Sequence, residues 1–566
     1  MQLLQHWAVT ALVAAPAPSN EPRAAAAACS LSSRDTWDYI VVGSGPGGLA
    51  MADRLSEAGH KVLLLEKGPP SSGRWGGTMK PQWLQGTNLT RFDVPGLCNQ
   101  IWADRAGIAC TDYDQLAGCI LGGGVAINSA LYWKPHPDDW NLSFPAGWKD
   151  ADMKAAVDKV FTRLPGTTTP SQDGKIYLPQ GFNTIGGGLK SAGWTEIDAN
   201  KENDKRNRTY AKTAYYYIGG ERGGPMATYL VTANARKNFA FWTGAGVKRV
   251  VRTGGKVTGV EVECGGSSGV VQLTATGRVV LSAGTFGSAK ILWRSGIGTK
   301  DMLDVVKSSS DGSTMISSDQ WINLPVGHNL YDHVGTDLEI AHSSVVGYDF
   351  YAAYNRPNQA DMNAYLNGRS GILAQSAPNF GPMFWEVIKG SDGVNRHLHW
   401  QARVEGSRAT SMTLTQYLGT GSVSRGRLTI NNQLRTIVSQ SPYLNNAQDK
   451  AAVVAGVQSL RDALSRVSGL TWVRPTTGQT SEAFVNSIPA NAGSRNSNHW
   501  IGTVKMGADD GRTGGTSVVD LNTKVYGTDN LFVVDASIFP GHVTSNPTAA
   551  ILSVAEHAAV KILALA

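Results

Sequence analysis

The sequence is poor in charged residues and has no long apolar run. Asp, Glu, Lys and Arg make up 17% of its 566 residues, below the roughly 25% of an average soluble protein. No apolar stretch reaches the roughly 18 residues that indicate a membrane-spanning helix. The 42% apolar content is too high for a disordered chain. These features exclude a polytopic membrane protein and intrinsic disorder, and no periodic pattern suggests a coiled coil or collagen rod.

The net charge is only +7. The densest basic stretch, Lys201–Arg208, is interrupted by Glu202 and Asp204. Such a dilute positive charge does not form the basic patch or stripe that attracts a polyanion. We therefore predict no nucleic-acid partner and no membrane attachment, and expect a small-molecule ligand.

Cysteine is scarce, with five residues in the chain. Because five is odd, at least one thiol is unpaired within the chain. No C-x-x-C motif is present, so we predict no zinc site. Cys110 and Cys119 are close enough in sequence to close a small loop by a disulfide, and buried packing is the alternative for every cysteine.

The first residues are typical of a secretory signal. The apolar run Trp7–Ala15 is followed by small residues and proline, although no Lys or Arg precedes it. We interpret residues 1–35 as a signal peptide and leader, with the ordered domain beginning near Thr36 and the mature protein extracellular. Three N-x-S/T sequons then predict a secreted glycoprotein; they lie at Asn88, Asn141 and Asn207.

Glycine is abundant, with 65 residues, and one cluster lies inside a βαβ pattern. The apolar strand Asp38–Gly43 leads into Gly43-Ser-Gly45-Pro-Gly-Gly48, a helical stretch over 49–58 and a second strand, Lys61–Glu66. Gly43 permits a tight turn, Gly45 permits close approach of the backbone to a pyrophosphate, and Gly48 permits packing of the helix on the strand. The helix N-terminus adds a partial positive charge for the phosphates.

The second strand of this unit ends in an acid. Glu66 is placed to accept hydrogen bonds from ribose hydroxyls, and a carboxylate there disfavours the 2′-phosphate of NADP. The unit therefore predicts a dinucleotide site, but by itself it leaves NAD and FAD both open.

Three later segments extend the pattern. They are Leu121–Trp133 with a triple glycine, Arg278–Gly298, and Asn530–Ala566, in which Asn546-Pro547 opens a final helix. Together they resemble the glucose–methanol–choline (GMC) oxidoreductases, which bind FAD, and Asn323–His333 also resembles a motif of that family. The resemblance is greatest to the flavoprotein domain of fungal cellobiose dehydrogenases, over 36–566. The supporting segments are Cys110-x8-Cys119, Ala130–Trp133, Gly421-x-x-Ser-Arg425-Gly426 and Ser497–Trp500.

The resemblance implies an α/β fold (α+β overall), in which a Rossmann-like FAD-binding domain is interleaved with a substrate domain built on an antiparallel sheet with helices. We assign residues 36–160, 225–320 and 490–566 to the FAD-binding domain, and 161–224 and 321–489 to the substrate domain. Within the former, Phe239–Glu263, broken by two glycines, is interpreted as a hairpin. We expect a monomer.

The same resemblance assigns the chemistry. It makes His499 the base that takes the hydroxyl proton and Asn546 its partner, whereas His328, His333 and His542 are interpreted as structural. A structural role is the alternative for His499, and a helix N-cap is the alternative, or an additional role, for Asn546. Residues implied to bind FAD are Gly43, Gly45, Gly48, Glu66, Gly123, Gly124, Asn128, Val247 and Asp535. Ile127 stands where some members attach FAD through His, so we predict non-covalent FAD.

Three residues concern the substrate. The resemblance implies that Arg403 holds a glucosyl unit and that Asn498 borders the substrate; Asn99 replaces a family glutamate, so a charged acceptor is lost. We predict a secreted FAD-dependent sugar dehydrogenase that oxidises the C1 hydroxyl of cellobiose or related saccharides to the lactone and passes electrons to a quinone or another small or protein acceptor. Alternatives are a GMC oxidase or dehydrogenase of glucose or aryl alcohols, a non-redox lyase of the hydroxynitrile type, and a flavin binder without catalysis.

Overall fold

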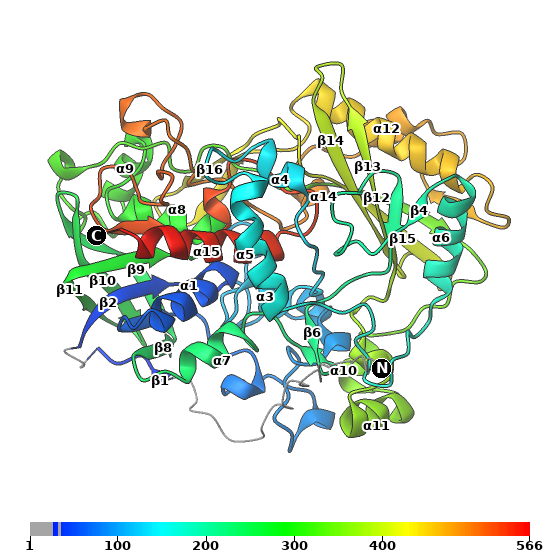
Figure 1. The fold of residues 1–566 in the computed structure, drawn as a ribbon, viewed down its shortest axis with the longest axis horizontal. Coiled ribbons are helices and arrows are strands. Elements are labelled where there is room, and N and C mark those ends of the chain that lie inside the picture. Colours follow the sequence, from blue (N-terminus) through cyan, green and yellow to red (C-terminus); the bar gives the residue numbers. More distant parts are fainter. Residues whose placement is uncertain (1–26, 32–34, 566) are drawn as a thin grey trace, which may run out of the picture.

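Two large β-sheets organise the molecule (Figure 1). The computed structural model describes residues 27–31 and 35–565, so the predicted signal segment 7–15 lies outside the described residues. The first sheet has eight strands in the order β1-β8-β3-β2-β11-β10-β9, with β19 beside β11. Its strands are β1 (Ala27–Ala28), β2 (Thr36–Val42), β3 (Val62–Leu65), β8 (Phe239–Thr243), β9 (Ala245–Thr253), β10 (Lys256–Cys264), β11 (Ser267–Leu281) and β19 (Leu531–Val533).

The predicted βαβ unit is present at the centre of the first sheet. Strands β2 and β3 pair in parallel, and α1 (Pro46–Glu57) connects them. The helix begins at Pro46, three residues earlier than the pattern predicts, because a proline at the first helical position needs no hydrogen-bond partner for its nitrogen. Gly59, with φ of +92°, ends the connection to β3. The Rossmann-like part of the predicted fold is therefore confirmed.

The predicted hairpin is only partly correct. Strands β9 and β10 form an antiparallel hairpin around Gly254 and Gly255, and β11 continues it. Residues Phe239–Thr243, which the sequence pattern includes in the hairpin, form β8 instead and pair in parallel with β3. Gly244, with φ of +67°, separates β8 from β9, so the chain turns from the parallel part of the sheet into the hairpin at this point.

The second sheet is antiparallel except for one pair at its edge. Its order is β18-β12-β15-β14-β13-β5-β4, and only β4 and β5 are parallel. These strands are β4 (Thr195–Glu196), β5 (Thr209–Ala211), β12 (Val334–Ala341), β13 (Phe380–Lys389), β14 (Asn395–Arg403), β15 (Ser411–Leu418) and β18 (Thr471–Arg474). All of them come from the two stretches assigned to the substrate domain.

Helices cover both sheets. In Figure 1, α1, α5 (Asp150–Arg163) and α15 (Thr548–Leu563) lie together beside the first sheet, and α15 packs on the other two. Helices α6 (Gln180–Ser191) and α12 (Ala447–Leu464) pack on the second sheet. Shorter elements are α2 (Gln100–Ala103), α3 (Gly124–Ile127), α4 (Pro137–Asn141), β6 (Tyr217–Ile218), β7 (Glu221–Arg222), α7 (Tyr229–Asn234), α8 (Gly284–Arg294), α9 (Lys300–Lys307), α10 (Ala352–Asn355), α11 (Gln359–Gly368), β16 (Arg427–Ile430), β17 (Thr436–Gln440), α13 (Ser481–Ser487) and α14 (Ala492–Arg495).

The chain joins the fold earlier than the sequence predicts. Strand β1 pairs in parallel with β8, and a disulfide joins Cys29 to Cys264 at the end of β10. The expectation that order begins near Thr36 is therefore wrong, because an alanine-rich segment without apolar periodicity gives no strand signal. A second disulfide links Cys110 to Cys119, as its spacing allows, and leaves Cys98 as a buried thiol. Among residues 27–31 and 35–565, no helix has the length and apolar character that crossing a bilayer requires.

Candidate active site

A cavity of about 930 Å³ lies at the carboxyl ends of the parallel strands and is bounded on its other side by the second sheet. This volume is near the upper end of the roughly 300–1,000 Å³ typical of small-molecule sites. Thirteen of the fourteen predicted site residues line it: Gly43, Gly45, Glu66, Asn99, Gly123, Gly124, Asn128, Val247, Arg403, Asn498, His499, Asp535 and Asn546. The exception is Gly48, whose place beside the turn is explained by packing: a Cβ there would lie 1.9 Å from the Gly43 carbonyl oxygen.

The acid at the end of β3 fixes the glycine turn. Glu66 accepts hydrogen bonds from the Ser44 backbone N–H at 3.0 Å and from the Gly68 N–H at 2.8 Å. Burial raises the pKa of Glu66, and these donors act against that rise. An ionised carboxylate has about four lone-pair positions, so Glu66 retains acceptor capacity for a hydroxyl in the cavity.

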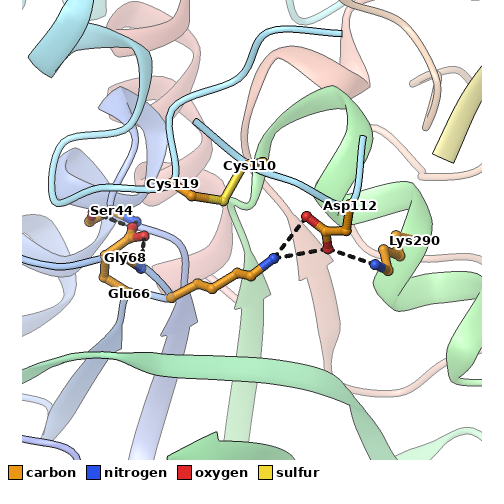
Figure 2. The surroundings of a disulfide bond; sticks show 8 residues. Ser44, Glu66, Gly68, Cys110, Asp112, Cys119 and Lys290 are labelled. Atoms are coloured by element: carbon orange, nitrogen blue, oxygen red, sulfur yellow. Dashed lines mark hydrogen bonds and ion pairs between the residues drawn. A yellow bond between two sulfur atoms is a disulfide. The ribbon is translucent and has the colours of Figure 1, made fainter. Parts of the chain in front are cut away.

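A disulfide-closed loop lies next to this acid (Figure 2). Within the loop, Asp112 pairs with Lys290 at 2.6 Å and with Lys67, which follows Glu66, at 2.9 Å. Burial alone would raise the pKa of Asp112, but the two lysines hold it below its ordinary value. The loop is thus fastened both to the end of β3 and to α8.

The carboxylate of Asp535 is held in place by hydrogen bonds from the protein itself. Its carboxylate accepts hydrogen bonds from the Gly284 N–H at 2.9 Å, the Ser288 hydroxyl at 2.6 Å and the Ser537 N–H at 2.8 Å. Burial raises the pKa of Asp535. The side chain therefore ties the first turn of α8 to the segment after β19, and it borders the cavity from that position.

His499 and Asn546 meet at the cavity wall. The Asn546 Nδ2 lies 3.1 Å from the His499 Nε2. Burial, reinforced by neighbouring His542, lowers the pKa of His499 to about 3, so the imidazole is neutral near pH 7. Helix α15 begins at Thr548 with Pro547 as its N-cap, so the N-cap alternative for Asn546 is wrong, and its side chain is available to the cavity.

Two polar side chains orient Asn546. The Trp133 Nε1–H and the Gln401 Nε2–H each donate to the Asn546 Oδ1 at 3.1 Å. Gln401 was not predicted from the sequence. It lies two residues before Arg403 on β14, so the alternation of side chains along a strand would have placed both on one face.

The three predicted substrate residues differ in how they are held. Arg403 pairs with Asp337 and Glu405, each at 3.3 Å. Asn99 is 4% exposed, and its Oδ1 has no hydrogen-bond partner within the described part of the chain. Asn498, at φ of +58°, also has a buried Oδ1 without a partner among those residues. Two amide acceptors therefore remain available at the cavity.

Two glycines of the cavity, Gly45 and Gly124, leave open space that protein packing does not explain. A Cβ at Gly45 would come no closer than 3.9 Å to its nearest non-neighbouring protein atom, the Ser282 carbonyl oxygen, and a Cβ at Gly124 would meet nothing within 4 Å. Both positions line the cavity, so a side chain at either one would occupy ligand space. The glycine turn, Glu66 and the N-terminus of α1 thus form a suitable cradle for the dinucleotide part of FAD.

Comparison with known proteins agrees with this geometry. Two GMC oxidoreductase family models match residues 100–335 and 422–555, and a model of NAD(P)-binding Rossmann-like domains matches 41–96. The oxygen-dependent choline dehydrogenase of Rhizobium etli (strain CIAT 652) is 26% identical over 557 residues, covering 90% of this chain and 92% of the relative.

Solved structures show the same fold. Pyridoxine 4-oxidase from Mesorbium loti superposes with a TM-score of 0.70 at 21% identity, covering 94% of this chain and 100% of that chain. A variant of the formate oxidase of Aspergillus oryzae RIB40 gives 0.73 at 17% identity, covering 94% and 98%. Taken with the two family models, these matches show that the chain belongs to the GMC oxidoreductase family and is an FAD-dependent enzyme.

Proposed function

We propose that this enzyme oxidises the C1 hydroxyl of a saccharide, with cellobiose or a related sugar as donor, to the corresponding lactone. Membership of the family makes it an oxidoreductase of alcohol-type donors. The observation that carries the proposal is the neutral imidazole of His499, held beside the Asn546 amide at a cavity shared with the glycine turn. The sugar-specific part rests on the polar residues of the cavity and on the sequence resemblance.

The side chains divide the work on the alcohol. FAD, when bound, supplies the acceptor for the hydride. In the structure, the Asn546 Nδ2–H donates to the lone pair of the His499 Nε2. When an alcohol binds, its hydroxyl takes that place and gives its proton to Nε2, while the released Nδ2–H donates to the alcohol oxygen and positions it. Because burial keeps His499 neutral, the base is ready without prior deprotonation.

The polar groups of the cavity favour a polyhydroxylated donor. The unpartnered acceptors of Asn99 and Asn498 suit sugar hydroxyls, because a buried acceptor left unpaired costs about 1–3 kcal/mol. Arg403 adds rigid donors to the same wall.

We further propose that the enzyme is secreted, carries non-covalent FAD and passes electrons to a quinone-type acceptor. The two disulfides suit an oxidising compartment. The three sequon asparagines, Asn88, Asn141 and Asn207, are exposed, as attachment of glycans requires. Intact-mass measurement of the secreted protein before and after deglycosylation tests this part.

Anaerobic stopped-flow mixing of the oxidised holoenzyme with a panel of donors tests the main proposal. The panel holds cellobiose, lactose, glucose, choline and a benzylic alcohol. Bleaching of the oxidised flavin band by the disaccharides at the lowest concentrations supports the proposal. Faster bleaching by the benzylic alcohol or choline contradicts the sugar assignment, and an unchanged oxidised spectrum with every donor favours a lyase or a binder.

A further inference from the structure

A series of hydrogen bonds connects the cavity, through the imidazole of His499, to buried groups behind it. On the cavity side, the His499 Nε2 meets the Asn546 Nδ2 at 3.1 Å. On the far side, the His499 Nδ1 lies 3.0 Å from the His333 Nδ1, and the His333 Nε2 lies 2.7 Å from the Val543 carbonyl oxygen. His333 is 1% exposed, so the end of this series that lies away from the cavity is shielded from water.

The side-chain amide of Asn546 determines which atom donates and which accepts in each of these hydrogen bonds. The Asn546 Oδ1 already accepts two N–H groups, from Trp133 and Gln401. Its Nδ2 must therefore face His499 and donate, which makes the His499 Nε2 an acceptor. A neutral imidazole with a bare Nε2 has its proton on Nδ1, so the His499 Nδ1–H donates to His333.

The same reasoning fixes the proton of His333. Its Nδ1 accepts from His499, so its proton is on Nε2, where the Val543 carbonyl oxygen accepts it. Burial, with neighbouring His542 and His499, lowers the pKa of His333 well below its ordinary value, which keeps the acceptor lone pair on Nδ1. The two rings are consistent with only one arrangement of protons.

We propose that His333 is a positioning residue, which holds His499 in the tautomer whose Nε2 has no proton and can accept the proton of the substrate hydroxyl. This inference rests on the proposed function, because it assigns a role to the far side of the same base. A neutral imidazole here does the orienting that a carboxylate does in a Ser-His-Asp triad. It does so without adding a buried negative charge.

A matched pair of amide variants separates positioning from packing. In His333→Asn, the Oδ1 stands near the position of the ring Nδ1 and still accepts from His499. In His333→Gln, the amide reaches the position of Nε2, so it keeps the partner at Val543 but offers no acceptor to His499. We expect His333→Gln to lower the flavin reduction rate constant by roughly 10–100-fold, the effect of losing a hydrogen-bond partner that orients a histidine.

The Asn variant should stay within about three-fold of the wild type, and the saturation constant for the donor should change little in either variant. Both proteins are normalised to bound FAD and compared by thermal unfolding. Equal reduction rates in the two variants, or a loss in both that follows their unfolding temperatures, would overturn the positioning role.

A second readout needs no substrate. The ¹⁵N chemical shifts of labelled histidine in the oxidised holoenzyme report which ring nitrogen of His499 has the proton, with His499→Asn identifying the signal. We expect a protonated Nδ1 in the wild type and in His333→Asn. In His333→Gln, where only the Asn546 amide still favours that tautomer, we expect a measurable fraction of the Nε2-protonated ring. A protonated Nε2 in the wild type would overturn the inference directly. If no donor reduces the flavin, the proposed function fails while this measurement still decides the tautomer.

Discussion

The carboxylate of Asp332 accepts a hydrogen bond from the backbone N–H of His499 at 2.7 Å. It also accepts from the Ser497 N–H and the Tyr443 hydroxyl, each at 2.8 Å. Burial raises the pKa of Asp332 to about 6, and these donors limit the rise. Since the next residue, His333, contacts the ring of His499, two consecutive residues before β12 fix both the backbone and the imidazole of the base.

His499→Asn should lower the rate constant for flavin reduction by roughly 10²–10⁴-fold, because it removes the group that accepts the hydroxyl proton. Anaerobic stopped-flow absorbance measures this effect. The control is the visible spectrum of the variant, which should still show bound, oxidised FAD. A reduction rate near that of the wild type would remove His499 from the role of base.

The pH dependence of kcat/KM should reflect a base with a low pKa. Because the pKa of His499 is lowered to about 3, the ring stays unprotonated as pH falls, and activity should persist well below the ordinary histidine pKa of about 6.5. Because Asp332, with a pKa of about 6, titrates in this range, the profile is compared with that of Asp332→Asn. In that variant we expect kcat/KM to be nearly flat from about pH 8 to about pH 5, measured over short times with a pH-insensitive acceptor. A decline centred near the ordinary value would show that His499 titrates like an exposed histidine.

Gln401→Met should reduce the flavin reduction rate by about 2–10-fold, the effect expected from losing one neutral hydrogen bond. Methionine has a similar length but cannot donate to the Asn546 Oδ1, so the amide becomes free to turn. Gln401→Glu is a second test, since it keeps the length and polarity but also lacks the N–H, so it should slow the flavin reduction at least as much as the Met variant. Wild-type rates in the Met variant would show that Trp133 alone suffices.

Replacing Cys110 and Cys119 together by serine should lower the free energy of unfolding by roughly 2–3 kcal/mol, the expected contribution of a small disulfide loop. Because the loop lies beside Glu66 and Asp112 (Figure 2), FAD should also dissociate faster. Fluorescence of released flavin and chemical denaturation measure the two effects. Cys98→Ser, which changes a thiol outside any disulfide, is the control and should affect neither as strongly.

His399→Leu should make stability less sensitive to acid. His399 is fully buried against Trp385, and burial lowers its pKa well below the ordinary value. Below about pH 6.5, His399 becomes protonated in the unfolded chain but stays neutral in the folded protein. The free energy of unfolding therefore falls as the pH falls, by about 2 kcal/mol at pH 5.

The readout for His399→Leu is the change in unfolding free energy between pH 7 and pH 5. It should be smaller in the variant than in the wild type, whatever the substitution does to packing at pH 7. Parallel pH profiles for the two proteins would mean that His399 is protonated in the fold.

Local sequence patterns predicted the parts of the structure that are set by local physics. The βαβ unit was recognisable because its strands are apolar throughout and its glycines occupy a tight turn. The boundary at Pro46 was missed, because the glycines next to it conceal the helical pattern. Strand β8 was assigned to the wrong partner, since pairing depends on contacts with β3, which is far away in the sequence.

The site residues show the same division. Resemblance placed His499 and Asn546 at one cavity, which the structure agrees with. That pair is oriented by Gln401, Asp332 and His333, all of which are far away in the sequence. Gln401, for example, is 145 residues before Asn546. Such contacts leave no short-range signal, so only the folded arrangement reveals them.

The covalent tie between Cys29 and Cys264 has a practical consequence for anyone producing this protein. A recombinant protein that begins at Thr36, the predicted start of the ordered domain, would lack Cys29. The thiol of Cys264, at the end of β10, would then have no disulfide partner. In oxidising medium that sulfur would be free to join a second molecule. Covalent dimers seen in such a preparation would then reflect the choice of first residue and say nothing of how the natural protein assembles.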